Sequence, residues 1–226
     1  MQAYNCTIGA WENMAGTRRS FKREGEAQRR EDLISAALDC IAEGGTRTAT
    51  VRAIADRAGV TPGLIRHYFR TKEDLLGEAY QTLMARMTDA SLSVLTAAPG
   101  DPLARLAAFV EAAVTPPVVD PRAMALWAGF IHMVQNDPAT RAVHQRTYLG
   151  FRDQLQALIV LALSADGRVP DDSLARSHAI ACNALIDGIW LEGSALPDAF
   201  AENELPRIAL TSVGLILGLQ LIREPS

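Results

Sequence analysis

Apolar residues along this chain recur every three or four positions, which is the spacing of one face of an α-helix. No segment alternates apolar and polar residues over the length of a strand, and no internal repeat is evident. Proline and glycine interrupt the pattern and divide it into about nine helical segments. The sequence therefore predicts an all-α protein, with a small amino-terminal part of short helices and a larger helical body.

The pattern also predicts where the helices lie. A first helix should cover residues 26–42 and end at Gly44 and Gly45. Thr71 is placed to cap a long helix over residues 72–95, which would leave the amino-terminal part and enter the body. The predicted body helices cover residues 103–114, 121–135, 138–163, 172–196 and 204–223. The domains expected are a disordered tail over residues 1–24, a small amino-terminal domain over 25–71 and a body over 72–226.

Residues 50–72 predict two short helices joined by a glycine turn. Thr50 can accept a hydrogen bond from the free N–H groups of the first helix, and Gly59 suits the left-handed residue that ends it. Thr61 repeats the N-cap, and Pro62 takes the first helical position, where its missing N–H costs nothing. Two helices in this arrangement form a helix-turn-helix, which places its second helix in the DNA major groove.

The two short helices are amphipathic. Their inner faces consist of Val51, Ile54, Ala55 and Ala58 in the first helix and Val60, Leu64, Ile65 and Phe69 in the second. The side chains left outside carry groups that suit bases and phosphates, and they are Arg52, Thr61, Gly63, Arg66, His67, Tyr68 and Lys72. We predict that this outer surface reads double-stranded DNA.

The chemistry of four outer residues suits distinct contacts. Arg66 can present two parallel N–H groups to guanine O6 and N7, and His67 can donate to an acceptor or pack against a thymine methyl. Gly63 allows the start of the helix to approach base edges closely. Thr61 can bond a phosphate as well as cap the helix. The sequence does not say which bases Arg66 and His67 read.

These segments resemble a known family, the tetracycline-repressor (TetR) family of bacterial transcriptional regulators. The resemblance rests on IADRAGV at residues 54–60 and HYFRTKEDLL at residues 67–76. Further along, AMALW at 123–127 and ALIDGIWL at 184–191 resemble the ligand-binding domain of BetI-type regulators, whose founding member responds to choline. Together the two resemblances cover nearly everything from about Arg29 to the end of the chain.

The TetR resemblance implies roles for the flanks of the DNA-reading surface. Tyr68 should contact a phosphate through its hydroxyl, and Lys72 should contact another from the start of the next helix. Thr50 and Arg52 should hold the opposite flank. A half-buried tyrosine of the core is the alternative interpretation of Tyr68.

The charge distribution agrees with a DNA-binding amino-terminal part. Residues 17–72 contain 12 Lys and Arg against 7 Asp and Glu, a net charge of +5. Residues 73–226 contain 10 against 18, a net charge of −8. A solvated charged helix would also explain the asymmetry on its own, but a basic head on an acidic body is typical of a separate nucleic-acid-binding domain.

A single recognition helix reads too few base pairs for specificity, which favours a homodimer that reads a palindromic operator. The two last predicted helices are candidates for the interface. The last one is apolar nearly all round, so it must be covered on more than one side, either by its own body or by a partner. Gly214 and Gly218 would permit close helix approach. The first of these helices carries an apolar stripe of Ala175, Ala179, Cys182, Ile186 and Ile189. The resemblance implies that the two helices pair into a four-helix dimer bundle.

Aromatic residues on three body helices predict a cavity for an effector. They are Trp127, Phe130, Tyr148 and Trp190, with a carboxylate nearby from Asp187 or Glu111. Aromatic faces and a carboxylate attract quaternary ammonium groups. Together with the BetI-type resemblance, this predicts a small, choline-like cation as effector.

Two alternatives to the cation cage stay open. Aromatic residues at helical spacing also occur as plain core residues. The BetI-type pattern has a second tryptophan where this chain has Ile131, which leaves an uncharged apolar metabolite as a competing effector. In either case we expect ligand binding to release DNA, with the helix over residues 72–95 as the lever between body and head.

Other functions find little support in the sequence. We find no nucleophile elbow, phosphate-binding glycine loop or metal-spaced His/Glu pair, so we predict no enzyme and no catalytic, cofactor or metal site. The three cysteines are widely spaced, and the longest apolar run is too short for a membrane span, as expected for a cytoplasmic protein. Met14 is an alternative native start. A nonspecific architectural DNA-binding protein and an activator of the same fold are the alternative functions.

Overall fold

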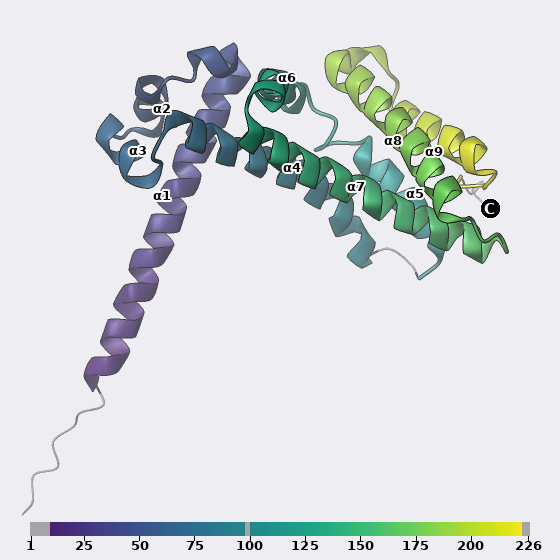
Figure 1. Cartoon of the computed structure of the whole chain (residues 1–226), viewed down its shortest axis with the longest axis horizontal. Helices are drawn as coiled ribbons and strands as arrows, with labels where there is room; N and C mark the ends of the chain where they lie inside the picture. Colours follow the sequence, from purple (N-terminus) through teal and green to yellow (C-terminus); the bar gives the residue numbers. More distant parts are fainter. Residues whose placement is uncertain (1–9, 98–99, 223–226) are drawn as a thin grey trace, which may run out of the picture.

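The computed structural model describes residues 10–97 and 100–222, with side chains from Gly25 onward except at residues 90, 96 and 97, and these residues form helices without a strand (Figure 1). This confirms the prediction of an all-α protein. The elements are α1 (Ala10–Thr48), α2 (Val51–Ala58), α3 (Pro62–Tyr68), α4 (Lys72–Ala97), α5 (Pro102–Ala113), α6 (Pro121–Asn136), α7 (Pro138–Ala165), α8 (Asp172–Ala195), the 3-10 helix η1 (Pro197–Ala199) and α9 (Glu204–Leu217).

The first and last helices differ most from the predicted bounds. Helix α1 runs from Ala10 to Thr48, and its geometry breaks at Gly45, where φ is 75°, so the predicted glycine stop appears as a kink. Helix α9 ends at Leu217 because Gly218 adopts a left-handed conformation with φ of 64°. The predicted tail falls at residues 1–9, outside the described chain, and at 10–24, whose side chains are not described, so its disorder stays a prediction.

Most helices begin at capping residues that can be identified in the sequence. Asp120 and Asp137 accept hydrogen bonds from the first backbone N–H groups of α6 and α7, and each aspartate is followed by a proline at the first helical position. Thr50 caps α2 in the predicted way, because its Oγ1 accepts from the N–H of Ala53 at 3.1 Å. Thr61 stands at the N-cap of α3 but makes no capping hydrogen bond, so that part of the prediction is wrong.

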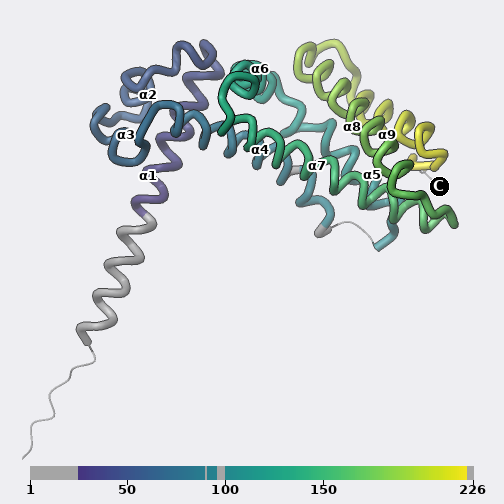
Figure 2. Tube along the Cα trace, in the orientation of Figure 1, coloured from purple at the N-terminus to yellow at the C-terminus, as the bar shows by residue number. Residues whose placement is uncertain are grey.

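Two buried clusters hold the molecule together, and their boundary does not follow the chain. The first, which we call the head core, joins α1, α2, α3 and the first half of α4 but also includes Leu126, Phe130 and Val134 of α6. The second, the body core, joins α5, the second half of α7, α8 and α9. Figure 2 shows the head at one end of the elongated chain and α9 near the other, with α6 between them. The head therefore shares its core with a helix of the body.

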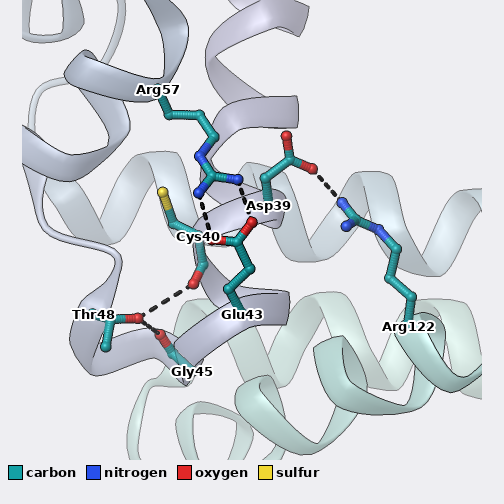
Figure 3. Close-up of polar contacts among 7 residues, drawn as sticks. All are labelled: Asp39, Cys40, Glu43, Gly45, Thr48, Arg57 and Arg122. Atoms are coloured by element: carbon teal, nitrogen blue, oxygen red, sulfur yellow. Dashed lines mark hydrogen bonds and ion pairs between the residues drawn. The ribbon is translucent and has the colours of Figure 1, made fainter.

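Helix α6 meets α1 through a tight crossing and an ion pair. A Cβ atom added at Gly129 would lie 2.9 Å from Cγ2 of Ile41, so only a glycine fits at this crossing without movement. At the start of α6, the guanidinium of Arg122 pairs with the carboxylate of Asp39 on α1 (Figure 3). Head and body are therefore connected twice: by the continuous helix α4, and by the non-covalent contacts between α1 and α6.

The end of α1 is also tied to α2. Arg57 and Glu43 form a two-point ion pair, and the hydrogen bonds from Arg57 lower the pKa of the Glu43 carboxyl (Figure 3). Thr48 Oγ1 lies 2.9 Å from the carbonyl oxygen of Gly45 and 3.3 Å from that of Cys40. These contacts orient the helix-turn-helix on the same helix that α6 crosses.

The predicted dimer stripe of α8 faces inward. Ala175, Ala179, Cys182, Ile186 and Ile189 are all buried in the protein's own structure, so assigning this stripe to a partner was wrong. A Cβ atom at Gly214 would lie 2.6 Å from the carbonyl oxygen of the nearby Leu219, and Gly218 caps α9, so both glycines serve the chain's own packing. The exposed apolar residues of the two helices are Leu174, Ile180 and Leu191 on α8 and Ile208, Leu215 and Ile216 on α9.

Candidate DNA-reading surface and effector cavity

Helix α3 is anchored by one side and leaves the other side free. Ile65 and Phe69 are buried in the head core, as the sequence predicts. Gly63, Arg66 and His67 are exposed on the opposite side. A Cβ atom at Gly63 would meet only Thr61 Oγ1 at 3.8 Å, so the protein's own packing does not require a glycine there. The missing side chain instead opens space on the outer surface.

Tyr68 and the end of α3 are held by an arginine. Tyr68 is half-buried against the head core, and its ring meets the ring of His67 edge-on at 5.2 Å. Arg30 of α1 donates to the carbonyl oxygen of Tyr68 at 3.0 Å and lies 4.5 Å from the centre of the Phe69 ring. The same guanidinium pairs with Glu78 of α4. Arg30 thus fixes the end of α3 relative to α4.

The residues predicted to flank the surface are Lys72, Thr50 and Arg52. The ammonium of Lys72 donates to the carbonyl oxygen of Thr46 at 3.1 Å, so in this structure it binds the chain itself. Thr50 uses its hydroxyl as the cap of α2, and Arg52 is exposed. Thr71 caps α4 as predicted, since its Oγ1 accepts from a backbone N–H of the next turn at 3.0 Å.

A cavity of about 440 Å³ lies between α4, α5, α6, α7 and α8, and two of its lining residues on α8, Gly188 and Leu191, are exposed. Its volume falls within the range typical of small-molecule sites. Of the residues that the sequence assigned to an effector site, four line the cavity: Trp127, Tyr148, Asp187 and Trp190.

Phe130 is a correction to the predicted site. It is fully buried in the head core, with its ring centre 4.9 Å from that of Tyr80. It lies three positions after Trp127 on α6 and packs against Tyr80 of α4, and it does not line the cavity. Glu111 is exposed and does not line the cavity. Ile131 packs against the head core and does not line the cavity. The absence of a tryptophan at this position therefore takes no residue from the cavity lining.

Asp187 is the charged group of the cavity, and two neighbours hold it. Its Oδ2 accepts from the Tyr148 hydroxyl at 2.6 Å and from Asn183 Nδ2 at 2.9 Å. Burial raises the pKa of the Asp187 carboxyl, although these hydrogen bonds and the nearby His144 act in the opposite direction. Burial and the bond to Asp187 raise the pKa of Tyr148 to about 12, so Tyr148 stays protonated and donates. The carboxyl group is thus fixed in place but costly to ionise.

His144 extends this polar network to α4. Its ring is stacked on that of Tyr148, with centres 5.4 Å apart. Its Nδ1 lies 2.6 Å from the hydroxyl oxygen of Tyr80, a buried residue of α4. Burial lowers the pKa of His144, which favours the neutral imidazole. A chain of contacts therefore runs from Asp187 on α8 through α7 to the helix that enters the head.

The two tryptophans form an aromatic corner. Their ring centres lie 5.8 Å apart, with the ring planes at 74°. The indole N–H of Trp190 donates to the carbonyl oxygen of Val118 at 2.8 Å, which fixes its orientation. Because the N–H of Trp190 is already satisfied, this residue offers a ligand its aromatic surface rather than a hydrogen bond.

Comparison with known proteins agrees with both parts of the molecule. Residues 33–79 match the bacterial regulatory proteins of the tetR family, and residues 102–218 match the C-terminal domain of BetI-type transcriptional repressors. The chain is 31% identical over 192 residues to the transcriptional regulator BetI of Stenotrophomonas maltophilia, covering 83% of this chain and 92% of that protein. It is 34% identical over 190 residues to BetI of Pseudomonas aeruginosa PAO1, covering 80% and 89%. The chain belongs to the TetR family.

Solved structures of transcriptional regulators show the same fold. A transcriptional regulator of Pseudomonas aeruginosa PAO1 is 32% identical, with a TM-score of 0.78 and coverage of 85% of this chain and 92% of that one. A regulator from Saccharomonospora viridis, crystallised with choline, is 21% identical with a TM-score of 0.68, covering 81% and 94%. These relatives are transcriptional regulators and not enzymes, as the sequence predicts for this TetR-family chain.

The structure adds cavity residues that the sequence reasoning missed. Helix α4 contributes Met84, Met87, Thr88 and Ser91, and α7 contributes His144. From the sequence, α4 was predicted only to connect body and head. The helical spacing of Ser91 from Met84 and Met87 was a signal that this face of α4 is not purely apolar core. Among the described residues, no group of three or more His, Cys, Asp or Glu could hold a metal. No helix in the described ranges combines the length and apolar character needed to cross a membrane.

Proposed function

We propose that this chain is an effector-responsive repressor that binds a palindromic operator as a homodimer and is released by a small organic cation. The carboxyl group of Asp187 carries the proposal, because it lies in an aromatic cavity without a cationic partner. No Lys or Arg lines the cavity, and Asp187 joins none of the ion pairs of the described residues. A ligand that brings a positive charge supplies what the site lacks.

A quaternary ammonium ion suits the site better than other cations. It has no N–H donors, so it leaves the bonds from Tyr148 and Asn183 to Asp187 in place. It is attracted to aromatic faces, and Trp127 and Trp190 offer two of them at an angle. The regulator from Saccharomonospora viridis that was crystallised with choline supports this ligand class. An uncharged apolar effector would bury Asp187 further with no compensating charge.

DNA reading is assigned to the exposed side of α3. Arg66 and His67 would contact base edges, with close approach at Gly63 and phosphate contacts from Thr61 and Tyr68. The positive net charge of residues 17–72 supports binding to a phosphate backbone. The flanking residues proposed to contact phosphates are Thr50, Arg52 and Lys72. Lys72 would exchange its bond to a backbone carbonyl for a phosphate oxygen.

Dimerisation is assigned to the outer faces of α8 and α9. Leu215 is 78% exposed, and Leu174 and Ile180 are each more than 40% exposed, which is unusual for large apolar side chains on neighbouring helices. A second copy of the chain would cover these side chains and place two α3 helices on one operator.

Two helices can transmit binding from the cavity to the head. Helix α4 carries Met84 and Met87 in the cavity and Leu75 in the head core. Helix α6 carries Trp127 in the cavity and, one turn on, Phe130 in the head core. A ligand that favours one position of these helices changes the spacing of the two recognition helices and weakens DNA binding. The transmission predicted for α4 alone is thus extended to α6.

Mobility-shift and thermal-shift measurements test the proposal together. An operator is first selected from a random duplex pool with the purified protein. Choline should raise the melting temperature of the wild-type protein and release the selected duplex. Asp187→Asn should bind the duplex normally and need about tenfold more choline for either effect. If apolar metabolites and not choline raise the melting temperature, the proposed ligand class is wrong. If no duplex is selected over bulk DNA, the assignment of DNA reading to α3 is wrong.

A further inference from the structure

The polar side chains of the cavity differ in whether the protein already satisfies them. The hydroxyl of Thr88 donates to the carbonyl oxygen of Met84 at 2.9 Å, and that of Thr147 to the carbonyl oxygen of Val143 at 3.0 Å. The Tyr148 hydroxyl donates to Asp187. These hydroxyl groups therefore need no ligand.

Ser91 is the exception. It lines the cavity and is 0% exposed, and its Oγ has no hydrogen-bond partner among the described residues. A serine in a helix usually either faces water or bonds the carbonyl one turn back, as Thr88 does on the same helix. A buried hydroxyl without a partner is rare in native proteins and costs free energy. Such a group is expected to be satisfied by something that enters the cavity.

The position of Ser91 on α4 makes this exception informative. Met84, Met87 and Ser91 lie three or four residues apart and face the cavity together. Methionine side chains adapt to the shape of a ligand, whereas a serine offers one directed donor and acceptor. This side of the cavity therefore combines an adaptable apolar surface with one fixed polar point.

We infer that Ser91 contacts the effector, and that the effector is an organic cation that also carries a hydrogen-bonding oxygen. The inference rests on the proposed function, in which Asp187 and the two tryptophans take the cationic end. The oxygen would bond the Ser91 hydroxyl, and the apolar part between would lie against the methionines. A tetraalkylammonium ion without oxygen would fill the aromatic corner and leave Ser91 unpaired.

A contact to Ser91 also places the effector directly on α4. Helix α4 begins at Lys72, beside α3, and its first half is part of the head core. An oxygen-bearing cation would thus join α8, through Asp187, to the helix that enters the head. A cation without the oxygen would reach α4 through apolar contacts alone.

Isothermal titration calorimetry with two matched cations tests the inference on the full-length protein. Choline and n-propyltrimethylammonium differ by a hydroxyl in place of a methyl group. We expect wild-type protein to bind choline roughly tenfold more tightly, which is the order expected for one buried hydrogen bond. Ser91→Ala should weaken choline binding by about that factor and leave n-propyltrimethylammonium binding unchanged.

Thr88→Val is the matched control, because it removes a hydroxyl from the same helix and cavity that the protein already bonds. It should keep the preference for choline. If Ser91→Ala weakens both cations equally, or neither, Ser91 does not bind the oxygen and the inference is wrong. If neither cation binds wild-type protein, the proposed cation site itself is wrong.

The melting temperature of the free protein gives a second readout. Ser91→Ala removes a buried hydroxyl that has no partner, so it should melt at the same temperature as wild type or higher. A clearly lower melting temperature would show that the hydroxyl has a partner within the free protein, and that would overturn the inference as well.

Discussion

The DNA-reading surface and the effector cavity are built in opposite ways. The DNA-reading surface comes from 23 consecutive residues, 50–72, whose caps, turn and inner face are all local. The cavity is formed by side chains of five helices that span residues 84–191. The first can be recognised from sequence because each residue acts through its neighbours. The second depends on how long helices are rotated against one another, which a short motif does not specify.

The two regions nevertheless share a core. Phe130 lies on a body helix but is buried with Tyr80 and the helices of the head. The separation of functions along the chain is therefore not a separation of folding units.

Phe130→Ala should have the largest effect. Truncating a fully buried phenylalanine costs about 3–5 kcal/mol, and here the loss should weaken head and body together in one unfolding transition. Urea denaturation followed by circular dichroism measures it. Leu149→Ala, at a side chain 41% exposed on α7, is the control and should change the free energy of unfolding by less than about 0.5 kcal/mol. Two separate transitions in Phe130→Ala would show that head and body fold independently.

Arg66→Ala should have the second-largest effect, and it should change only DNA binding. We expect a loss of about 1–3 kcal/mol in operator binding and relaxed preference at one position of each half-site, with choline binding unchanged. Lys72→Ala should weaken all duplexes alike and reduce the salt dependence of binding. Mobility shifts with operator variants at several salt concentrations separate the two. Identical behaviour of both variants would contradict the division between base reading and phosphate contact.

Asp187→Asn should affect only the cavity. It should weaken choline binding by about tenfold, or on the order of 1.4 kcal/mol, and leave operator binding intact. Asp153→Asn, at an exposed carboxylate on α7, is the control. Calorimetry measures both, and equal loss in the two variants would mean that long-range charge and not the site attracts the cation.

The pH dependence at this site has a definite sign. The pKa of Asp187 is raised by burial, so the folded protein holds this proton more tightly than the unfolded chain. Between the ordinary pKa of an aspartate and the raised one, the contribution of Asp187 to the free energy of unfolding falls as pH rises. Choline affinity should change in the opposite sense and fall as pH drops through the raised pKa. Asp187→Asn should lose both dependences and melt higher than wild type near neutral pH.

Arg122→Gln should have the smallest effect on stability and a selective effect on coupling. The exposed pair with Asp39 contributes about 0–1 kcal/mol to folding. If α6 transmits binding through α1, losing the pair should reduce the effect of choline on operator affinity while each ligand alone binds almost normally. Arg146→Gln, at an exposed arginine of α7 that joins none of the ion pairs of the described residues, is the control. Equal coupling in both variants would exclude this ion pair from the transmission.

The sequence predicted local features well and long-range ones less well. Thr50, Gly59 and Thr71 serve as predicted because caps act within one turn. Phe130 was misassigned because it lies only three positions after Trp127 on α6. Trp127 lines the cavity, whereas Phe130 is buried in the head core. The α8 stripe was misassigned because a stripe shows that one face is buried but not what covers it.

The central claim is that the effector cavity and the DNA-reading surface are linked energetically, and reciprocal titration tests it most directly. Operator affinity is measured with and without saturating choline, and choline affinity with and without saturating operator. Linkage requires the two ratios to be equal, and the account predicts that each ligand weakens the other by the same factor. Choline that binds the protein with one affinity, whether or not the operator is present, would contradict the account.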